Sequence, residues 1–476
     1  MTLRSCCAFL MLGGLVSSFS LRAAVYKPRP HHVFMSAASH ANVPPVTADA
    51  VGQVNVAELK SPFLRTLVER GFYHQCTDIK GLDEKMEEGQ IGAYLGFDAT
   101  ADSLHVGSLL QIMILRHLQR AGHKPFVLVG GGTTKIGDPS GKDESRQMLG
   151  DSAIETNIKG ISSVFTKFLS FGDGPADAVM VNNDAWLSTL GYVDFLQKYG
   201  THFTINRMLG FESVRLRLER EQPLTFLEFN YMLLQAYDFV ELHKRFGCVL
   251  QLGGSDQWGN MISGSLSCGR RTLGADLYAL TAPLITTSDG KKMGKSAAGA
   301  IWLNADKLSD YDYWQFWRNT ADNDVIRFLK LFTDLPLEEI SKLEKLKGAA
   351  INEAKIILAD ETTTLIHGAE CLPKIHDTVK QLFAAGGGAS GSGQALPRAA
   401  VMQEEVKEGM PVLDLFIRAG LAQTKGEVRR LIRGGGAKID GAKIEDEAAV
   451  VREEDFNKGE LKLSSGKKKH AIIAID

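Results

Sequence analysis

The sequence lacks the features that mark several protein classes. Its six cysteines are scattered, with no Cys-x-x-Cys pair and no cysteine–histidine cluster, so we predict neither a zinc site nor a disulfide framework. No stretch reaches about 18 consecutive apolar residues, so we expect no membrane span. The formal net charge is only −2, so any nucleic-acid-binding surface must be local. What remains is a 476-residue chain of ordinary globular composition, long enough for about two to four domains.

Acidic residues are missing from the first 48 positions, where serine, alanine and basic residues are frequent. An apolar run at 6–19 is too short to span a bilayer. This composition is typical of a mitochondrial or chloroplast transit peptide, or of a signal-like region before a plastid transit segment. We therefore assign residues 1–58 to a targeting segment and expect the protein in the mitochondrion and/or chloroplast. A disordered tail of a cytoplasmic protein is the alternative.

Short apolar runs alternate with stretches of helical spacing after about residue 54. The runs lie at 91–97, 125–131, 177–183, 248–254 and 278–287. Fully apolar strands that alternate with helices predict an α/β fold, with a parallel sheet covered on both faces. Polar, glycine-containing loops follow three of these runs, at 96–100, 130–142 and 253–257. Ligands bind beyond the carboxyl ends of such strands, so the three loops predict a common site.

The remaining chain divides into three parts. Residues 304–383 show helical spacing, and residues 384–398 are rich in glycine, alanine and serine, as in flexible linkers. Residues 399–476 are enough for a small separate domain.

The pattern of residues 399–476, the C-terminal tail, predicts a helix, a turn, a second helix and a hairpin. Thr424 and Glu427 form the pattern of a capping box at the start of the second helix, and Asp440-Gly441 is a type I′ turn signal. Between positions 425 and 443 six basic residues stand against two acidic ones, a net charge of +4. RNA binding and a merely solvated face explain this charge equally well. The RNA-binding candidates are Lys425, Arg429, Arg430, Arg433 and Lys438.

The stretch "YLGFDATADSLHVGS" (94–108) joins a predicted strand to a predicted helix. Gly96 lets a ligand approach the main chain because it has no Cβ. His105 and Gly107 fall in the first helical turn, whose free N–H groups and dipole favour anions. By itself His-x-Gly is a weak signal, and a capping or core histidine explains it as well.

The stretch "DGKKMGKS" (289–296) places three lysines around a glycine after an apolar run. Lysines on a mobile loop can stabilise the negative charge of a phosphate group as that charge moves from the substrate to the leaving group. In isolation an exposed basic turn is the simpler interpretation.

Together the two stretches resemble the HIGH and KMSKS signatures of class I aminoacyl-tRNA synthetases. The blocks "GDPSGKDESR" (137–146), "NNDAW" (182–186), "EFNYMLLQAYDF" (228–239) and "GGSDQWGN" (253–260) resemble the bacterial-type tyrosyl-tRNA synthetase family. The resemblance runs from about residue 61 to the C-terminus. It implies a Rossmann-like catalytic domain at 59–303, an α-helical anticodon-side domain at 304–383 and a ribosomal-protein-type, α+β RNA-binding domain at 399–476. It also implies a homodimer, with 202–219 at the interface.

The resemblance also implies which residues hold tyrosine. Tyr94 and Asp238 are implied to bind the substrate hydroxyl. A phenol hydroxyl both donates and accepts a hydrogen bond, and these two residues supply a donor and an acceptor for it. The remaining tyrosine-binding residues are Asp138, Tyr231 and Gln235 at the ammonium group and Gln257 beside the carboxylate. Positions 231, 235 and 238 lie on one face of a helix.

For the nucleotide, the resemblance implies Thr100, His105, Lys292 and Lys295 as catalytic residues. The other ATP-binding candidates are Gly96, Asp98, Gly107, Ser108, Lys142, Arg146, Gly253 and Asp256, with Thr133 and Asn183 near the site. ATP enters as a substrate with Mg²⁺, and no protein-bound metal or organic cofactor is implied. The implied partners are L-tyrosine, ATP and tRNA(Tyr), with no membrane.

Two positions depart from the family pattern. Ser108 replaces the usual last residue of the first signature, where a hydroxyl can still donate a hydrogen bond to a ribose oxygen. Gly294 replaces a serine in the second signature.

Three alternatives remain. A tryptophanyl-tRNA synthetase is disfavoured by Asp238, by the 253–260 block and by the basic tail. A non-catalytic, synthetase-derived RNA-binding protein is disfavoured because the charged candidates are kept together. An adenylyltransferase that makes a small cofactor needs neither the helical region nor the tail.

Overall fold

The protein is described here by a computed structural model, which covers residues 49–50, 54–139, 148–288, 290, 293, 295–296, 299–383, 395–466 and 469–476. Among these residues, no helix is both long enough and apolar enough to cross a membrane. Of the predicted targeting segment the structure describes only 49–50 and 54–58, with a 3₁₀ turn at Val56–Glu58.

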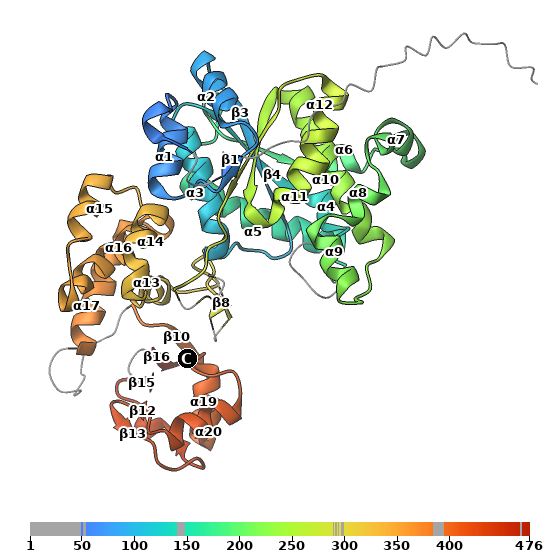
Figure 1. The fold of residues 1–476 in the computed structure, drawn as a ribbon. Helices are drawn as coiled ribbons and strands as arrows, with labels where there is room; N and C mark the ends of the chain where they lie inside the picture. Colours follow the sequence, from blue (N-terminus) through green and yellow to red (C-terminus); the bar gives the residue numbers. More distant parts are fainter. Residues whose placement is uncertain are drawn as a thin grey trace, which may run out of the picture. The chain divides into compact units, whose positions relative to one another are not determined.

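A seven-stranded sheet forms the centre of the first part of the chain (Figure 1). In spatial order its strands are β1 (Asp49–Ala50), β2 (Gln75–Cys76), β7 (Tyr278–Ala282), β6 (Cys248–Gly254), β3 (Gly92–Asp98), β4 (Lys124–Gly130) and β5 (Val179–Asn182). The last five strands run parallel, which confirms the predicted α/β fold. Strands β1 and β2 add an antiparallel edge that the sequence did not predict, because two-residue strands show no alternation.

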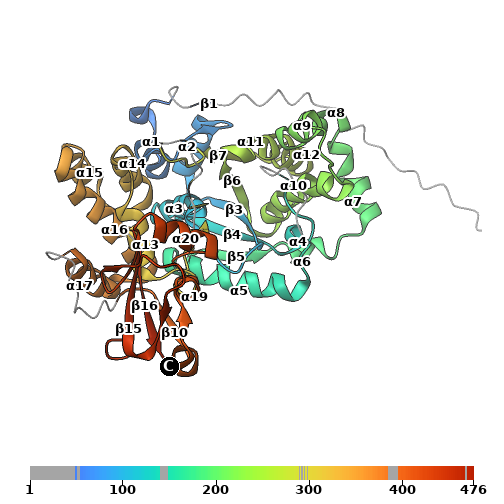
Figure 2. The ribbon, with the colours of Figure 1, turned by 90° about the horizontal axis from the view of Figure 1, so that it is seen from below.

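Helices cover both faces of this sheet (Figure 2). They are α1 (Pro62–Arg70), α2 (Ile79–Glu88), α3 (Val106–Arg120), α4 (Gly131–Thr134), α5 (Asp151–Phe168), α6 (Asp184–Leu187), α7 (Tyr192–Lys198), α8 (Ile205–Leu209), α9 (Glu212–Glu219), α10 (Phe226–Phe246), α11 (Trp258–Asn260) and α12 (Ser267–Leu273). Alternate residues of β3 separate the two cores. Leu95 packs with α3 and α5 on one face, and Tyr94 packs with α10 on the other.

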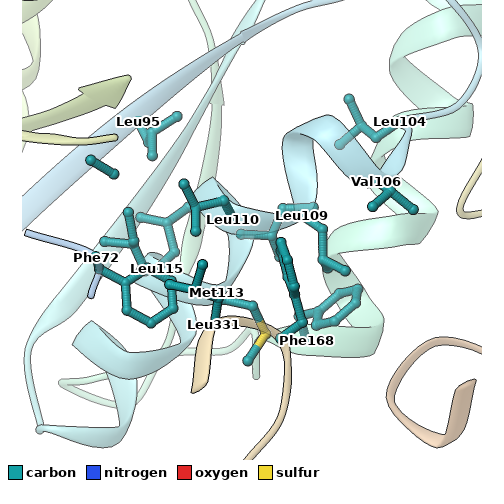
Figure 3. Packing of buried hydrophobic residues seen from close by; sticks show 14 of the residues in the cluster. Phe72, Leu95, Leu104, Val106, Leu109, Leu110, Met113, Leu115, Phe168 and Leu331 are labelled. Atoms are coloured by element: carbon teal, nitrogen blue, oxygen red, sulfur yellow. The ribbon is translucent and has the colours of Figure 1, made fainter. Parts of the chain in front are cut away.

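Helix α3 is enclosed by apolar side chains from several parts of the chain. Figure 3 shows Leu110 and Met113 of α3 in one cluster with Phe72, Phe168 and Leu331. Burial of each such side chain contributes about 1.5–3 kcal/mol relative to exposure. The helix is therefore held firmly, with its N-terminus beside the carboxyl end of β3.

Five α-helices follow the seven-stranded sheet, as the spacing of residues 304–383 predicted. They are α13 (Asp310–Arg318), α14 (Asp322–Phe332), α15 (Leu337–Leu343), α16 (Ile351–His367) and α17 (Leu372–Phe383). Arg70 at the end of α1 donates to the carbonyl oxygens of Thr333 and Leu335, at 3.0 and 2.6 Å. Arg116 of α3 pairs with Asp334 at 2.6 Å. These contacts join the loop after α14 to α1 and α3, which pack against the seven-stranded sheet.

The last part of the chain has its own core and its own sheet. The strands, in spatial order, are β10 (Arg398–Val401), β16 (Lys469–Ile475), β15 (Glu460–Ser465), β12 (Ala437–Ile439) and β13 (Ala442–Lys443). The helices are α18 (Gln403–Glu408), α19 (Val412–Arg418) and α20 (Lys425–Arg433). Of the expected linker, residues 395–398 are described. Leu396 among them is buried, and β10 begins at Arg398.

The local predictions for this tail are confirmed with one correction. Asp440 and Gly441 have φ of 47° and 88°, as a type I′ turn between β12 and β13 requires. The Thr424 hydroxyl accepts from the Glu427 amide at 3.2 Å, so it caps α20. The return bond of a capping box is absent, because the Glu427 carboxylate accepts from the amide of Gln423 instead, at 2.7 Å.

Candidate active site

The candidate site lies where the strand order of the sheet reverses. From β3 the chain proceeds to β4 and β5 on one side, and β6 and β7 are added on the other. In open α/β sheets such a switch point leaves a crevice beyond the carboxyl ends of the strands. Here a cavity of about 240 Å³ occupies that position. Its wall includes Tyr94–Asp98 of β3 and Gln251–Gly253 of β6, which are neighbours in the sheet.

The cavity brings together most of the residues that the sequence singled out. The predicted residues in its wall are Tyr94, Gly96, Asp98, Thr100, Thr133, Asp138, Asn183, Tyr231, Gln235, Asp238, Gly253, Asp256 and Gln257. They come from β3 and the loop after it, from α4 and the loop after it, from the residue that follows β5, from β6 and the 3₁₀ turn after it, and from α10. Residues 231, 235 and 238 of α10 all line the cavity, which confirms that they share one helix face.

Asp238 is fully enclosed and is held by two donors. The Asn183 side-chain amide donates to Oδ2 at 3.0 Å, and the Trp186 indole N–H donates to Oδ1 at 2.7 Å. Burial raises the pKa of Asp238 to about 7, because the charged form loses its hydration. The two N–H donors act in the opposite direction, since they stabilise the carboxylate. Asp238 is therefore an acceptor whose charge depends on these two donors near neutral pH.

A second buried network connects this end of the cavity to β3. The Thr133 hydroxyl donates to Asp98 Oδ1 at 2.9 Å and accepts from the Asn183 amide at 3.1 Å. The Tyr231 hydroxyl donates to Asp98 Oδ2 at 3.2 Å. Burial raises the pKa of Tyr231 far above its ordinary value, and the negative charge of Asp98 adds to this effect. Tyr231 is therefore a neutral hydrogen-bond donor, and Asp98 holds the cavity wall together as well as facing the cavity.

Gly130 at the end of β4 leaves the space for this network. A Cβ on Gly130 would collide with the carboxylate of Asp98 and the hydroxyl of Thr133. Gly96, in contrast, has room for a Cβ on the protein side, 3.9 Å from Leu128. Its lack of a side chain opens the main chain of β3 to the cavity itself.

The other end of the cavity is formed by the loop after β6. The Gln257 amide lies 3.5 Å from Asp138 Oδ2, at the limit of a hydrogen bond. Asn260 donates to Gln257 Oε1 at 3.4 Å, which orients the amide from behind. Gly253 lies against Met261, so a Cβ there would come within 2.8 Å of the Met261 sulfur.

His105 is the N-cap of α3, one residue before the first helical turn in which we expected it, and it acts as the capping histidine that was the alternative interpretation. Its Nδ1 accepts a hydrogen bond from the Gly107 amide at 3.0 Å. A Cβ on Gly107 would lie 2.6 Å from the His105 ring, so only glycine accommodates this cap. His105, Gly107 and Ser108 are not part of the cavity wall; they stand at the helix N-terminus beside it.

Some predicted residues lie outside the part of the chain that the structure describes. They are Lys142, Arg146 and Lys292. Lys295 is described only as a backbone position in β8 (Lys295–Ser296), which pairs with β9 (Gly299–Ala300).

Sequence reasoning missed three polar residues of the site. Trp186 lies in a block that was noticed, but its contact with Asp238 appears only in the fold. Gln111 lines the cavity one turn after Ser108, a spacing that could have suggested it. Gln251 also lines the cavity and is beside Tyr94 in the sheet; a lone glutamine in an apolar strand was the available signal.

The predicted RNA-binding residues of α20 are exposed, and Lys438 on β12 is half-buried. Three of them take part in ion pairs with acidic residues beyond the basic stretch. Arg433 and Arg429 both pair with Glu447, at 2.6 and 3.6 Å, and Lys425 pairs with Asp414 at 2.7 Å. The local positive charge is therefore smaller than the sequence window indicated.

Comparison with known proteins agrees with this geometry. The family model "tRNA synthetases class I (W and Y)" matches residues 86–384, and the S4 domain matches residues 413–457. A tyrosine–tRNA ligase of Caulobacter vibrioides is 57% identical over 417 residues, which cover 88% of this chain and 98% of that protein. One of Rhodospirillum rubrum is 56% identical, over 87% of this chain and 98% of that protein.

A crystal structure shows the same fold. The C-terminally truncated mitochondrial tyrosyl-tRNA synthetase of Aspergillus nidulans has a TM-score of 0.61 and 31% identity, and the match covers 70% of this chain and 95% of that one. The matched regions contain the cavity, both predicted signatures and the basic helix α20. The chain therefore belongs to the class I tRNA synthetases, within the family of tyrosyl-tRNA synthetases that carry a C-terminal S4 domain.

Proposed function

We propose that the protein is a tyrosine–tRNA ligase, which joins L-tyrosine to ATP to form tyrosyl-AMP and pyrophosphate and then transfers tyrosyl to the 3′ end of tRNA(Tyr). The observation that carries this proposal is a cavity whose wall contains both Tyr94 and a fully buried, doubly hydrogen-bonded Asp238. The tyrosine–tRNA ligases to which the chain is 57% identical support the same activity.

The enclosed end suits a phenol better than an apolar ring. A phenol hydroxyl can donate to the Asp238 carboxylate and accept from the hydroxyl of Tyr94. A phenylalanine side chain can form neither of these two hydrogen bonds, so it loses the contacts that tyrosine makes with the site and is rejected. Tyrosyl-tRNA synthetases are the standard illustration of this form of discrimination. An indole is also disfavoured, because its single N–H can donate to Asp238 but the ring offers no oxygen that could accept from Tyr94.

The middle of the cavity suits the ammonium group of the amino acid. Asp138, Tyr231 and Gln235 face this region from two elements. A carboxylate, a neutral hydroxyl and an amide oxygen can each accept one N–H of an ammonium group. Gln257 then lies beside the substrate carboxylate, which is already ionised and attacks the α-phosphorus without a general base.

The nucleotide occupies the end formed by the loops after β3 and β6. We assign the ribose to Gly253 and Asp256, and the polyphosphate to Thr100, His105 and the N-terminus of α3. We also assign polyphosphate contacts to Lys142, Arg146, Lys292 and Lys295; the first three lie outside the described residues. Mg²⁺ accompanies ATP as part of the substrate. Cations and N–H donors aimed at the pyrophosphate stabilise the charge that develops there, so activation needs no covalent enzyme intermediate.

We assign RNA binding to the last part of the chain, residues 399–476, with the helices of 304–383 on the anticodon side. The match to the S4 domain supports this assignment. Arg430 is exposed on α20 and takes no part in the Glu447 pairs of Arg429 and Arg433. Lys425, Arg429, Arg433 and Lys438 complete the candidate surface. Phosphate contacts from such residues give salt-dependent affinity.

We propose that the protein is a homodimer. Helices α7, α8 and α9, drawn in green in Figure 1, expose large apolar side chains. Val193 is 73% exposed, Ile205 60% and Leu218 51%, and Phe226 at the start of α10 is 69% exposed. We infer that these side chains form one apolar surface, because large exposed apolar patches mark protein interfaces. It overlaps the segment 202–219 to which the family resemblance assigned the interface.

We further propose that residues 1–58 direct the protein to a mitochondrion or chloroplast. The acid-free composition supports import. The structural likeness to a protein described as mitochondrial is consistent with it. A fusion of residues 1–58 to a fluorescent protein is expected in an organelle, and a cytosolic signal would contradict the assignment.

Tyrosine-dependent ATP–pyrophosphate exchange tests the activity. We expect exchange with tyrosine and none with tryptophan. Asp238→Ala should lose at least about 100-fold in kcat/KM for tyrosine, because a buried charged partner of the substrate is removed. Lys295→Ala should lower kcat about 100- to 1,000-fold with little change in the KM for tyrosine. Exchange that is indifferent to Asp238, or is supported by tryptophan, refutes the proposed specificity.

A further inference from the structure

The loop of residues 99–104 joins β3 to α3 and carries Thr100, to which we assign a polyphosphate contact. Both the backbone amide and the backbone carbonyl of its first residue, Ala99, make hydrogen bonds. The Ala99 amide donates to the Thr134 hydroxyl at 2.9 Å, and the Asn157 side chain donates to the Ala99 carbonyl at 2.8 Å. The loop is thus tied to α4 and to α5 at its start.

The end of the same loop is tied to the segment 301–307, which follows the lysine-rich stretch. The Leu303 amide donates to the Leu104 carbonyl, and the Val106 amide donates to the Ile301 carbonyl, both at 2.9 Å. A side-chain contact reinforces the backbone pairing, because Lys307 Nζ lies 2.6 Å from Asp102 Oδ2.

Gly160, in the middle of α5, is the point where these elements meet. A Cβ on Gly160 would lie 2.7 Å from the carbonyl carbon of Asp102, and closer still to its oxygen. These are backbone atoms, so they cannot rotate away. The Asn304 amide donates to the Gly160 carbonyl at 3.3 Å, which brings the segment 301–307 to the same place. The absence of a side chain at Gly160 therefore lets α5 support the loop directly.

We propose that Gly160 and the Asp102–Lys307 ion pair are positioning residues for tyrosine activation: they set the place of Thr100 and of the N-terminus of α3 although they lie outside the cavity wall. The inference rests on the proposed function. An ordinary contact of 3.4 Å requires the Asp102 carbonyl to move by at least 0.7 Å if residue 160 gains a Cβ. A misplacement of about 1 Å at a reacting centre costs about 100-fold in rate, so the effect reaches the chemical step.

The first test is Gly160→Ala in the full chain. We expect kcat of tyrosine-dependent pyrophosphate exchange to fall more than about 10-fold. The KM and the equilibrium dissociation constant for tyrosine should stay within about two-fold, because the Asp238 end of the cavity is built from other elements. Gly426→Ala is the matched control. It is a helical glycine in α20 whose added Cβ makes an ordinary contact of 3.8 Å, so the exchange rate should not change.

A second series keeps the inference testable if Gly160→Ala fails to fold. Lys307→Met and Asp102→Asn should each lower kcat about two- to five-fold, as expected for an exposed pair. The double variant should be no slower than either single one, and Lys307→Arg should keep the wild-type rate. A merely structural role would lower the melting temperature without this non-additive change in kcat.

The outcomes separate the two proposals. A wild-type protein without tyrosine-dependent exchange contradicts the proposed function. An active wild type whose folded Gly160→Ala variant keeps its kcat overturns the positioning role. A loss of tyrosine affinity that equals the loss of kcat also overturns it, because the effect would then be general. If Gly160→Ala does not fold, additive effects of Asp102→Asn and Lys307→Met overturn it.

Discussion

The clearest prediction concerns the indole that donates to Asp238. Trp186→Phe keeps an aromatic ring but removes the N–H that lies 2.7 Å from Asp238 Oδ1. A hydrogen bond to a charged group is worth about 1.5–3 kcal/mol, and one pKa unit corresponds to about 1.4 kcal/mol. The pKa of Asp238, already raised to about 7 by burial, should therefore rise by about 1–2 units.

The sign of the effect follows from the role of the carboxylate. Ionised Asp238 accepts from the substrate phenol, so kcat/KM for tyrosine should increase with pH and level off above the pKa. At pH 7 the ionised fraction falls from about one half to between about one in 11 and one in 100. We therefore expect a loss of about 5- to 50-fold at pH 7 that becomes smaller as the pH rises. The pKa of Asp238 in the folded protein, about 7, lies above the ordinary value of 3.8. The free energy of unfolding therefore decreases as the pH rises from 3.8 to about 7.

The assay is kcat/KM for tyrosine in pyrophosphate exchange between about pH 5.5 and 8.5, below the titration of the substrate amino group. Trp314→Phe is the matched control. Its indole N–H donates to Asp360 Oδ1 at the same distance, 2.7 Å, but in the helical region. The control should lose similar stability and keep the wild-type pH profile. The reasoning would be refuted if Trp186→Phe lowered kcat/KM by the same factor at every pH and left the apparent pKa of the profile unchanged.

Three further predictions concern stability, RNA and assembly. Burial alone would raise the pKa of Asp334, but Arg116 and Arg120 hold this pKa below its ordinary value. The ionised carboxylate therefore stabilises the fold above about pH 4, and this stabilisation is lost as the pH falls. Asp334→Asn should therefore lower the unfolding free energy in urea by about 1–3 kcal/mol at pH 7, and the difference should vanish in acid. Arg430→Ala should weaken tRNA binding, reduce the salt slope of log K by about 0.7–0.9 and leave pyrophosphate exchange unchanged; an unaltered slope would remove this residue from the RNA surface. Ile205→Glu should shift the protein from dimer to monomer in light scattering, and a dimer at micromolar concentration would argue for another interface.

Much of the catalytic part was predictable because its physics is local. Five apolar runs became the five parallel strands, and their polar loops met at one edge because carboxyl ends of parallel strands share an edge. His105 and Gly107 opened a helix as their positions indicated. Tyr231, Gln235 and Asp238 share a face because helical spacing alone requires it.

Other features depend on segments far apart in the chain, so no local pattern contains them. The sequence did not predict the antiparallel edge of the sheet, where β2 pairs with the distant β7. The predicted capping box of α20 was wrong for a local reason, because Glu427 accepts from the neighbouring Gln423 amide. It also overestimated the basic surface of α20, because Glu447 and Asp414 lie outside the counted window.

The sequence by itself determined the fold class, the order of the parts and the residue types that meet at the cavity, since periodicity, turn chemistry and motif spacing act over short distances. The contacts that hold those residues in place depend on tertiary packing. Trp186 is 52 positions from Asp238, and Gly160 is 58 positions from Asp102. Their contacts arise from packing of α6 and α5 against other elements, and packing depends on shape across the whole core.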